Sequence, residues 1–311
     1  MSRGPSQSAS VEAVPLGVHV ALLAVQMSFG GFHVVAKILL DELTPLALAG
    51  IRVGIATPIL LLLAWSFDRC LPKRGDLPIL ALLGLLGVFL NQLLFIVGLQ
   101  FTTATNAAIL MPSIPVFAVA VAALLRIESI GWRRLLGIAL AVAGALVVLG
   151  PGRLSTSSSV VLGNLLILLN CLSYATFLVL QRPLLERLPW RTTIAWAFLF
   201  GGTGVLAVAS VDLFRLEPAA VSGSTWAGIA YIVALPTVFS YAVNTWAVKR
   251  SSPSMAATYT TAQPLFAAAL ASWFLGEVLG WREGVGFLLI AAGLLRVSWR
   301  RRDPLPIPDH E

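Results

Sequence analysis

Charged residues are scarce in this chain. Asp, Glu, Lys and Arg together make up 11% of its 311 residues, whereas soluble domains carry about 25%. Hydrophobic side chains supply 58%, and the mean hydropathy is +0.89. Because so few charges cannot cover the surface of a soluble fold, enzymes of the soluble α/β kind are excluded.

Long stretches of the chain contain no charged residue. No Asp, Glu, Lys or Arg occurs within residues 77–125, 154–181, 218–248 or 251–276. Each stretch exceeds the roughly 20 apolar residues that cross a bilayer core of about 30 Å. The pattern predicts an all-α polytopic membrane protein.

Cysteine and histidine are also rare. Cys70 and Cys171 are the two cysteines, and neither forms part of a CxxC pair. This excludes a disulfide framework and a metal cluster, and no metal or cofactor is expected. The three histidines, His19, His33 and His310, have no acidic neighbour at membrane depth. An intramembrane enzyme is therefore only a remote alternative.

Dividing the apolar runs at Pro, Gly and charge clusters predicts ten transmembrane helices. They are expected near residues 17–38, 46–66, 77–98, 103–125, 134–150, 160–181, 192–211, 226–247, 254–275 and 281–298. With the N-terminus inside, 16 of the 21 Lys and Arg residues fall in cytoplasmic segments. The positive-inside rule thus predicts that both termini are cytoplasmic. The net charge of +7 then requires no nucleic-acid partner.

The two halves of the chain are similar in sequence. A shift of 149 residues aligns the third to fifth spans with the eighth to tenth, and a shift of 145 aligns the first span with the sixth. The first shift superimposes Ala107-Ala108 on Ala256-Ala257, Pro115 on Pro264, Glu128 on Glu277, Trp132-Arg133 on Trp281-Arg282, Gly137 on Gly286 and Gly144 on Gly293. Five spans are an odd number, so the second copy enters the membrane from the opposite side, which predicts an inverted repeat.

The repeat gives the expected organisation of the chain. Residues 1–16 form a cytoplasmic tail, 17–150 the first repeat, 151–159 a linker, 160–298 the second repeat and 299–311 a second cytoplasmic tail. Inverted repeats favour alternating access to a site between the halves.

Several motifs resemble those of EamA transporters in the drug/metabolite transporter superfamily. The segment Phe274-Leu275-Gly276-Glu277, followed by Trp281-Arg282-Glu283 and 286–293, is similar to the signature that closes each half of these proteins, and 126–144 is its first-half counterpart. Residues 26–31 and 94–105 resemble the plant nodulin-like branch, whose members move amino acids or auxin. The resemblance implies a ten-helix secondary carrier with both ends in the cytoplasm.

Polar side chains at membrane depth nominate the transport pathway, because they are costly there unless they are paired or face water. Asn91 and Gln92 align with Ser240 and Tyr241 under the 149-residue shift, which suits a shared central cavity. Helical spacing also puts some of these side chains on a common face. Interhelical hydrogen bonding is the alternative role for each. The candidate substrate-binding residues are His33, Asn91, Gln92, Asn106, Tyr174, Tyr241, Asn244, Tyr259 and Gln263.

Arg52 is the one charge well inside a predicted span. It could attract a substrate carboxylate, or it could reach lipid headgroups or helix ends. Because EamA proteins often carry Arg here whatever they transport, the resemblance favours the structural role.

We predict a secondary transporter that exports a small metabolite by alternating access. An amino acid or related zwitterion is the first choice, since the pathway candidates are amide, hydroxyl and aromatic groups. A multidrug or other metabolite exporter is the alternative, favoured if Trp196 and Trp246 line an apolar vestibule. The expected partners are a small-molecule substrate and the lipid bilayer of a plasma or bacterial inner membrane, and a homodimer stays open.

Overall fold

Helices supply all the regular structure in the described part of the chain. The computed structural model describes residues 14–102, 107, 110–128, 130–149, 158–266, 269 and 281–298. Six helical spans among them are long and apolar enough to cross a membrane: Leu16–Leu39, Pro45–Phe67, Arg74–Phe101, Val160–Leu185, Trp190–Arg215 and Gly223–Arg250. The prediction of an all-helical, multi-pass membrane protein is thus confirmed for this part.

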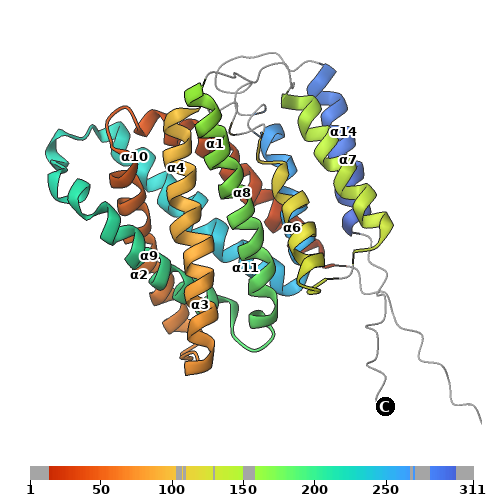
Figure 1. The fold of residues 1–311 in the computed structure, drawn as a ribbon, viewed down its shortest axis with the longest axis horizontal. Helices are drawn as coiled ribbons and strands as arrows, with labels where there is room; N and C mark the ends of the chain where they lie inside the picture. Colours follow the sequence, from red (N-terminus) through yellow and green to blue (C-terminus); the bar gives the residue numbers. More distant parts are fainter. Residues whose placement is uncertain are drawn as a thin grey trace, which may run out of the picture.

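The helices run up and down through one bundle (Figure 1). Their bounds are α1 Leu16–Leu39, α2 Pro45–Phe67, η1 Arg74–Asp76, α3 Leu77–Gly84, η2 Leu85–Leu90, α4 Asn91–Phe101, α6 Ser113–Leu124, α7 Trp132–Leu149, α8 Ser158–Leu185, α9 Trp190–Arg215, η4 Pro218–Ala220, α10 Gly223–Ile232, η5 Val233–Phe239, α11 Ser240–Arg250, α12 Pro253–Thr258, η6 Tyr259–Ala262 and α14 Trp281–Ser298.

Most predicted spans agree with these helices to within four residues at either end. The fourth and ninth spans differ. α6 starts only at Ser113, and residues 103–106 and 108–109 of the predicted span 103–125 lie outside the described residues. In the ninth span the 3₁₀ turn η6 follows α12, and most of its second half lies outside the described residues.

Two of the long spans contain a π-helical segment at mid-length. η2 joins α3 to α4, and η5 joins α10 to α11. In η5, Pro236 has no backbone N–H to donate to the carbonyl of Ile232 four residues earlier. Thr237 Oγ1 donates to that carbonyl at 2.7 Å, and Ser240 Oγ donates to Leu235 O at 2.9 Å. Hydroxyl groups therefore satisfy backbone oxygens that the interrupted helix leaves open.

The π segment of the first half is supported in a similar way, but from other helices. Ser173 Oγ of α8 donates to the carbonyl of Leu86 at 2.7 Å. The hydroxyl of Tyr241 lies 3.1 Å from the backbone carbonyl oxygen of Gly87. Gly87 corresponds to Pro236 under the 149-residue shift. The same place in each half thus interrupts the α-helix by different means.

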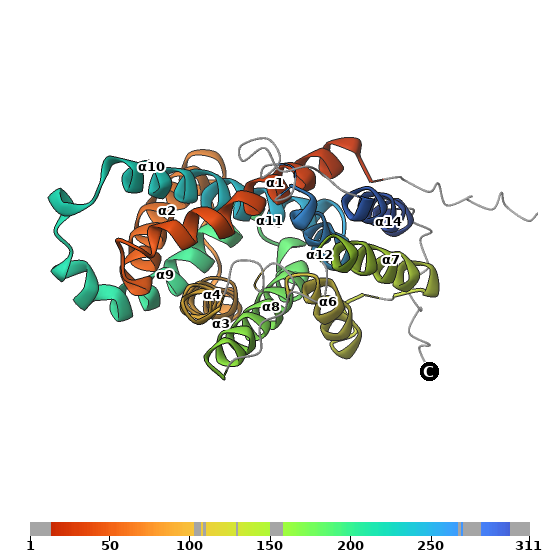
Figure 2. The same cartoon turned by 90° about the horizontal axis from the view of Figure 1, so that it is seen from above.

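α7 and α14 lie side by side in both ribbon views (Figures 1 and 2). Their glycines permit the approach: a Cβ on Gly137 would lie 3.0 Å from the carbonyl oxygen of Gly293, and one on Gly144 would lie 2.8 Å from that of Gly286. Small residues let membrane helices pack backbone to backbone. The shift of 149 relates Gly137 to Gly286 and Gly144 to Gly293, so the two contacts are reciprocal.

A second close crossing joins α3 to α9. A Cβ on Gly84 would lie 2.6 Å from the carbonyl oxygen of Ala197 and 2.7 Å from the backbone nitrogen of Gly201. Because α3 continues through η2 into α4, this crossing sets the position of the first residues of α4. Those residues, Asn91 and Gln92, line the site described next.

Candidate functional site

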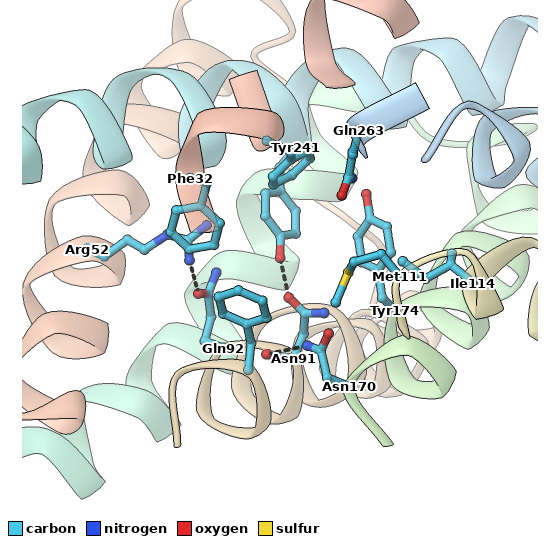
Figure 3. A pocket seen from close by; sticks show the side chains of 12 residues that line it. Phe32, Arg52, Asn91, Gln92, Met111, Ile114, Asn170, Tyr174, Tyr241 and Gln263 are labelled. Atoms are coloured by element: carbon cyan, nitrogen blue, oxygen red, sulfur yellow. Dashed lines mark hydrogen bonds between the residues drawn. The ribbon is translucent and has the colours of Figure 1, made fainter. Parts of the chain in front are cut away.

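A small cavity lies in the interior of the bundle, between helices of both halves (Figure 3). Its volume is about 50 Å³. A buried water needs about 10–15 Å³ on this measure, whereas pockets for drug-sized ligands span about 300–1,000 Å³. The cavity as it stands therefore has room for a few water molecules, and a metabolite requires the helices to separate. It is lined by Phe29, Phe32, Arg52, Asn91, Gln92, Phe95, Met111, Ile114, Asn170, Tyr174, Tyr241 and Gln263.

Arg52 of α2 forms one side of this cavity. Its Nε donates to Thr237 Oγ1 at 2.5 Å and its Nη1 donates to Gln92 Oε1 at 2.6 Å. The guanidinium carbon lies 4.3 Å from the centre of the Phe32 ring, in cation–π geometry. Only 3% of the residue is exposed. Arg52 therefore does not reach the headgroups or helix ends at which the sequence analysis placed it, and its contacts join α2 to α4 and η5.

Tyr241 and Asn91 join the two halves across the cavity. The hydroxyl of Tyr241 donates to Asn91 Oδ1 at 2.6 Å, and Asn170 Nδ2 donates to the backbone carbonyl of Asn91 at 2.6 Å. Figure 3 shows all three side chains turned toward one another from α11, α4 and α8. Asn91 thus connects one helix of the first half to two helices of the second.

Aromatic rings pack around the Tyr241 side chain. Phe198 meets it edge-on with ring centres 5.1 Å apart, and Tyr174 meets it in the same manner at 6.1 Å. Asn244 Nδ2 donates to the hydroxyl of Tyr174 at 2.9 Å. Asn244 is 3% exposed and lies behind the cavity wall rather than in it. Its contact fixes a phenol that does line the cavity.

Gln263 approaches the cavity from the side opposite Arg52 (Figure 3). Its Nε2 donates to Gln26 Oε1 of α1 at 2.9 Å. Among the described residues, Gln263 Oε1, Gln26 Nε2 and Gln92 Nε2 are buried polar atoms without a hydrogen-bond partner. Buried polar atoms are nearly always paired, so these three amide atoms indicate a place for a polar ligand or water.

The sequence candidates divide into four groups. Five of them line the cavity together: Asn91, Gln92, Tyr174, Tyr241 and Gln263. Asn244 stands directly behind them. Tyr259 lies away from the cavity, where its hydroxyl is 2.5 Å from His19 Nδ1. Asn106 and the side chain of His33 lie outside the described residues.

The candidate set omitted some of the lining residues. The candidates were chosen as polar side chains in apolar spans, so this criterion could not select the apolar residues Phe29, Phe32 and Phe95. Arg52 did carry a signal, as the one charge inside a span, but the family pattern led to a structural interpretation.

Two basic side chains cap helix ends on opposite faces of the bundle. Lys37 Nζ donates to the carbonyls of Leu99 at 2.8 Å and Thr102 at 3.2 Å, at the end of α4. Arg182 Nη1 donates to the carbonyls of Val248 at 2.7 Å and Lys249 at 2.9 Å, at the end of α11. A cation at a helix C-terminus pairs with unsatisfied carbonyls and with the helix dipole.

No group of three or more His, Cys, Asp and Glu side chains that could hold a metal ion occurs in the described part of the chain. The polar groups that line the cavity are amide, phenol hydroxyl and guanidinium groups, set among aromatic and apolar side chains.

Comparison with known proteins gives a consistent result. The sequence model of the EamA-like transporter family matches residues 16–150 and again residues 161–299. Protein WALLS ARE THIN 1 of Arabidopsis thaliana is 30% identical, over 93% of this chain and 84% of its own. An uncharacterized transporter of Archaeoglobus fulgidus is 31% identical, over 89% and 95%. A solved crystal structure that is 16% identical has a TM-score of 0.72 over 92% of this chain and 99% of that one, which shows a shared fold.

Proposed function

The chain belongs to the EamA-like transporter family, and we propose that it is a secondary transporter that moves a small metabolite across a cell membrane by alternating access. The observation that carries the proposal is the small cavity between the two halves, across which the hydroxyl of Tyr241 donates to Asn91 Oδ1. A site between two repeats is where such carriers bind their substrates.

Two observations support an inverted repeat. The family matches once in each half, and the glycine contacts between α7 and α14 are reciprocal under the 149-residue shift. Reciprocal contacts are the mark of a twofold relation. With an odd number of spans per half, the halves then have opposite orientations, and both chain termini are cytoplasmic as the charge distribution predicts.

The two basic caps offer a way to alternate access. Lys37 and Arg182 correspond under the 145-residue shift, and Leu99 and Val248 correspond under the 149-residue shift. In an inverted repeat the Lys37 cap belongs to the outer face and the Arg182 cap to the inner face. Both caps are present here and the cavity is small. Transport then consists of releasing one cap at a time, which widens the cavity toward one side.

The proposed substrate is an amino acid or related zwitterion, moved outward. Its support is the set of buried amide atoms without partners in the described cavity, Gln92 Nε2 and Gln263 Oε1, together with the aromatic wall. The multidrug alternative has less support. Trp196 lines a separate apolar groove with Trp65 and Leu71, and Trp246 lies beneath Arg250, with 4.8 Å between its ring centre and the guanidinium carbon.

Counterflow tests the proposal. The purified full chain is reconstituted in liposomes, and exchange of a labelled amino-acid panel is followed with and without a pH gradient. Saturable exchange is the expected result. If the protein is folded and no amino acid in the panel is exchanged, the amino-acid proposal is refuted, and drugs and other metabolites are tested next.

Variants of the cavity sharpen the test. Asn91→Ala, Tyr241→Phe and Asn244→Ala are each expected to slow exchange while protein levels in the membrane stay normal. Tyr231→Phe is the matched control, since it removes a phenol hydroxyl that donates to Ser28 O at 2.7 Å outside the cavity. Wild-type exchange in all three cavity variants would overturn the assignment of the site.

A further inference from the structure

Arg52 carries a buried positive charge with neutral partners only. In the part of the chain that the structure describes, no ion pair includes it, and its two hydrogen-bond partners are the hydroxyl of Thr237 and the amide of Gln92. A guanidinium has five N–H donors. The contacts account for two of them, so further donors remain beside the cavity. A buried charge that lacks a counter-charge is costly.

Gln92 places an additional donor next to this charge. Its Oε1 accepts from Arg52 Nη1, which fixes the orientation of the amide and makes Nε2 the free end. Gln92 is 1% exposed, and within the described residues Nε2 has no hydrogen-bond partner. Gln92 thus presents an N–H group without a partner directly beside a guanidinium that has more N–H groups than its two hydrogen bonds use. A carboxylate, which accepts through both oxygens and binds guanidinium in a bidentate manner, satisfies that set.

The same cavity offers an ammonium group no negatively charged partner among its described lining residues. The described lining contains no Asp or Glu side chain. The unpaired acceptor there, Gln263 Oε1, is uncharged. A buried ammonium would therefore lose its hydration without gaining a counter-charge, and Arg52 would repel it. Because Phe29, Phe32 and Phe95 line the cavity, the body of the ligand meets apolar rings.

We propose that Arg52 and Gln92 bind the carboxylate of the substrate, and that this carboxylate, rather than an ammonium group, determines which molecules the cavity accepts. The ligand class is a small carboxylate with an apolar or aromatic body, and amino acids qualify through their carboxylate. The proposal rests on the proposed transport function, because it assigns the cavity to the transported molecule.

Three probes with the same ring separate the two charged groups: 3-phenylpropionate has only the carboxylate, phenylethylamine has only the ammonium, and phenylalanine has both. Binding to the full chain in lipid nanodiscs is measured by titration calorimetry. We expect 3-phenylpropionate and phenylalanine to bind at least about tenfold more tightly than phenylethylamine, in line with one charged hydrogen bond. Equal or tighter binding of phenylethylamine would overturn the proposal.

Gln92→Glu is the most informative variant. It is nearly isosteric, removes the Nε2 donor and provides Arg52 with a permanent carboxylate partner. We expect it to weaken 3-phenylpropionate binding by about tenfold to a hundredfold and to leave phenylethylamine binding unchanged or tighter. Gln100→Glu is the matched control, because it adds the same charge at an exposed position of the same helix. It should alter the binding of neither 3-phenylpropionate nor phenylethylamine.

A purely structural role for Gln92 would weaken all three probes together, and that result would contradict the proposal. If Gln92→Glu does not fold, the ratio of the wild-type affinities for 3-phenylpropionate and phenylethylamine still tests the proposal. Arg52→Lys keeps the charge but not the bidentate geometry of the guanidinium, so it should lower that ratio. Counterflow separates this proposal from the transport function. Exchange of amines alone would refute the carboxylate site, whereas carboxylate binding without exchange would refute transport.

Discussion

The crossing of α3 and α9 allows a quantitative test of the fold. A Cβ added to Gly201 would overlap the backbone carbonyl of Gly84 and would lie 2.6 Å from Val88 Cβ. Real Cβ atoms essentially never come within 3.0 Å of another group. The atoms that Gly201→Ala meets are mainly backbone, which cannot rotate away, so the two helices have to separate.

The size of the effect follows from two opposing terms. Alanine stabilises a helix interior by about 1 kcal/mol relative to glycine. Overpacking typically costs about 1–3 kcal/mol, and a rigid backbone contact belongs at the upper end. Gly284→Ala in α14 isolates the second term, because Gly284 is also helical but has nothing within 4 Å of an added Cβ. We therefore expect Gly201→Ala to be about 3 kcal/mol less stable than Gly284→Ala.

Thermal unfolding in detergent, followed by the fluorescence of the nine tryptophans, measures this difference. At roughly 2 °C per kcal/mol for a chain of this size, the two variants should melt about 6 °C apart. Gly204→Ala should fall between them, because its Cβ would meet the Phe89 ring, at 2.8 Å, rather than backbone. Equal melting temperatures for Gly201→Ala and Gly284→Ala would refute the close crossing.

Three further predictions concern the topology, a surface loop and the site. Cys70 is exposed between α2 and α3 whereas Cys171 is buried, so a membrane-impermeant maleimide should label the protein at one position and only from the cytoplasmic side; labelling of intact cells from outside would reverse the proposed orientation. Hydrogen bonds from the N-cap of α10 hold the pKa of Glu42 below its ordinary value of 4.5, so their contribution is present above that pH and is lost as the pH falls through the lower, folded-state pKa. Glu42→Gln should therefore melt below wild type at neutral pH and match it in acid, and a pH-independent difference would contradict this assignment. Gly87→Ala should slow counterflow, because the new Cβ would lie 2.5 Å from Phe177 Cγ and push that ring against Tyr241; unchanged exchange would remove η2 from the site.

Tyr259 does not line the cavity with Gln263, because the helix changes its geometry between these two residues. Tyr259 and Gln263 are four residues apart, which in an α-helix puts them on one face. Tyr259 starts the 3₁₀ turn η6, in which each residue advances by about 120°, so four residues separate the two side chains by about a third of a turn. Tyr259 consequently meets His19, and Gln263 meets the cavity.

The sequence by itself determined the class of the protein and the limits of most helices, because a bilayer imposes a length and an apolar composition on each span that can be counted directly. It also revealed the duplication and five of the residues that line the cavity, since polar groups at membrane depth are rare enough to stand out.

Only the tertiary structure decided which of these groups meet. The partners of Arg52 come from residues 40 and 185 positions away in the chain, and no local pattern records such a distance. The π segments likewise depend on hydroxyl groups that reach their carbonyls partly from other helices, as Ser173 does for Leu86. Whether a buried cation has an acid among its neighbours is likewise a property of the packed bundle rather than of any one span.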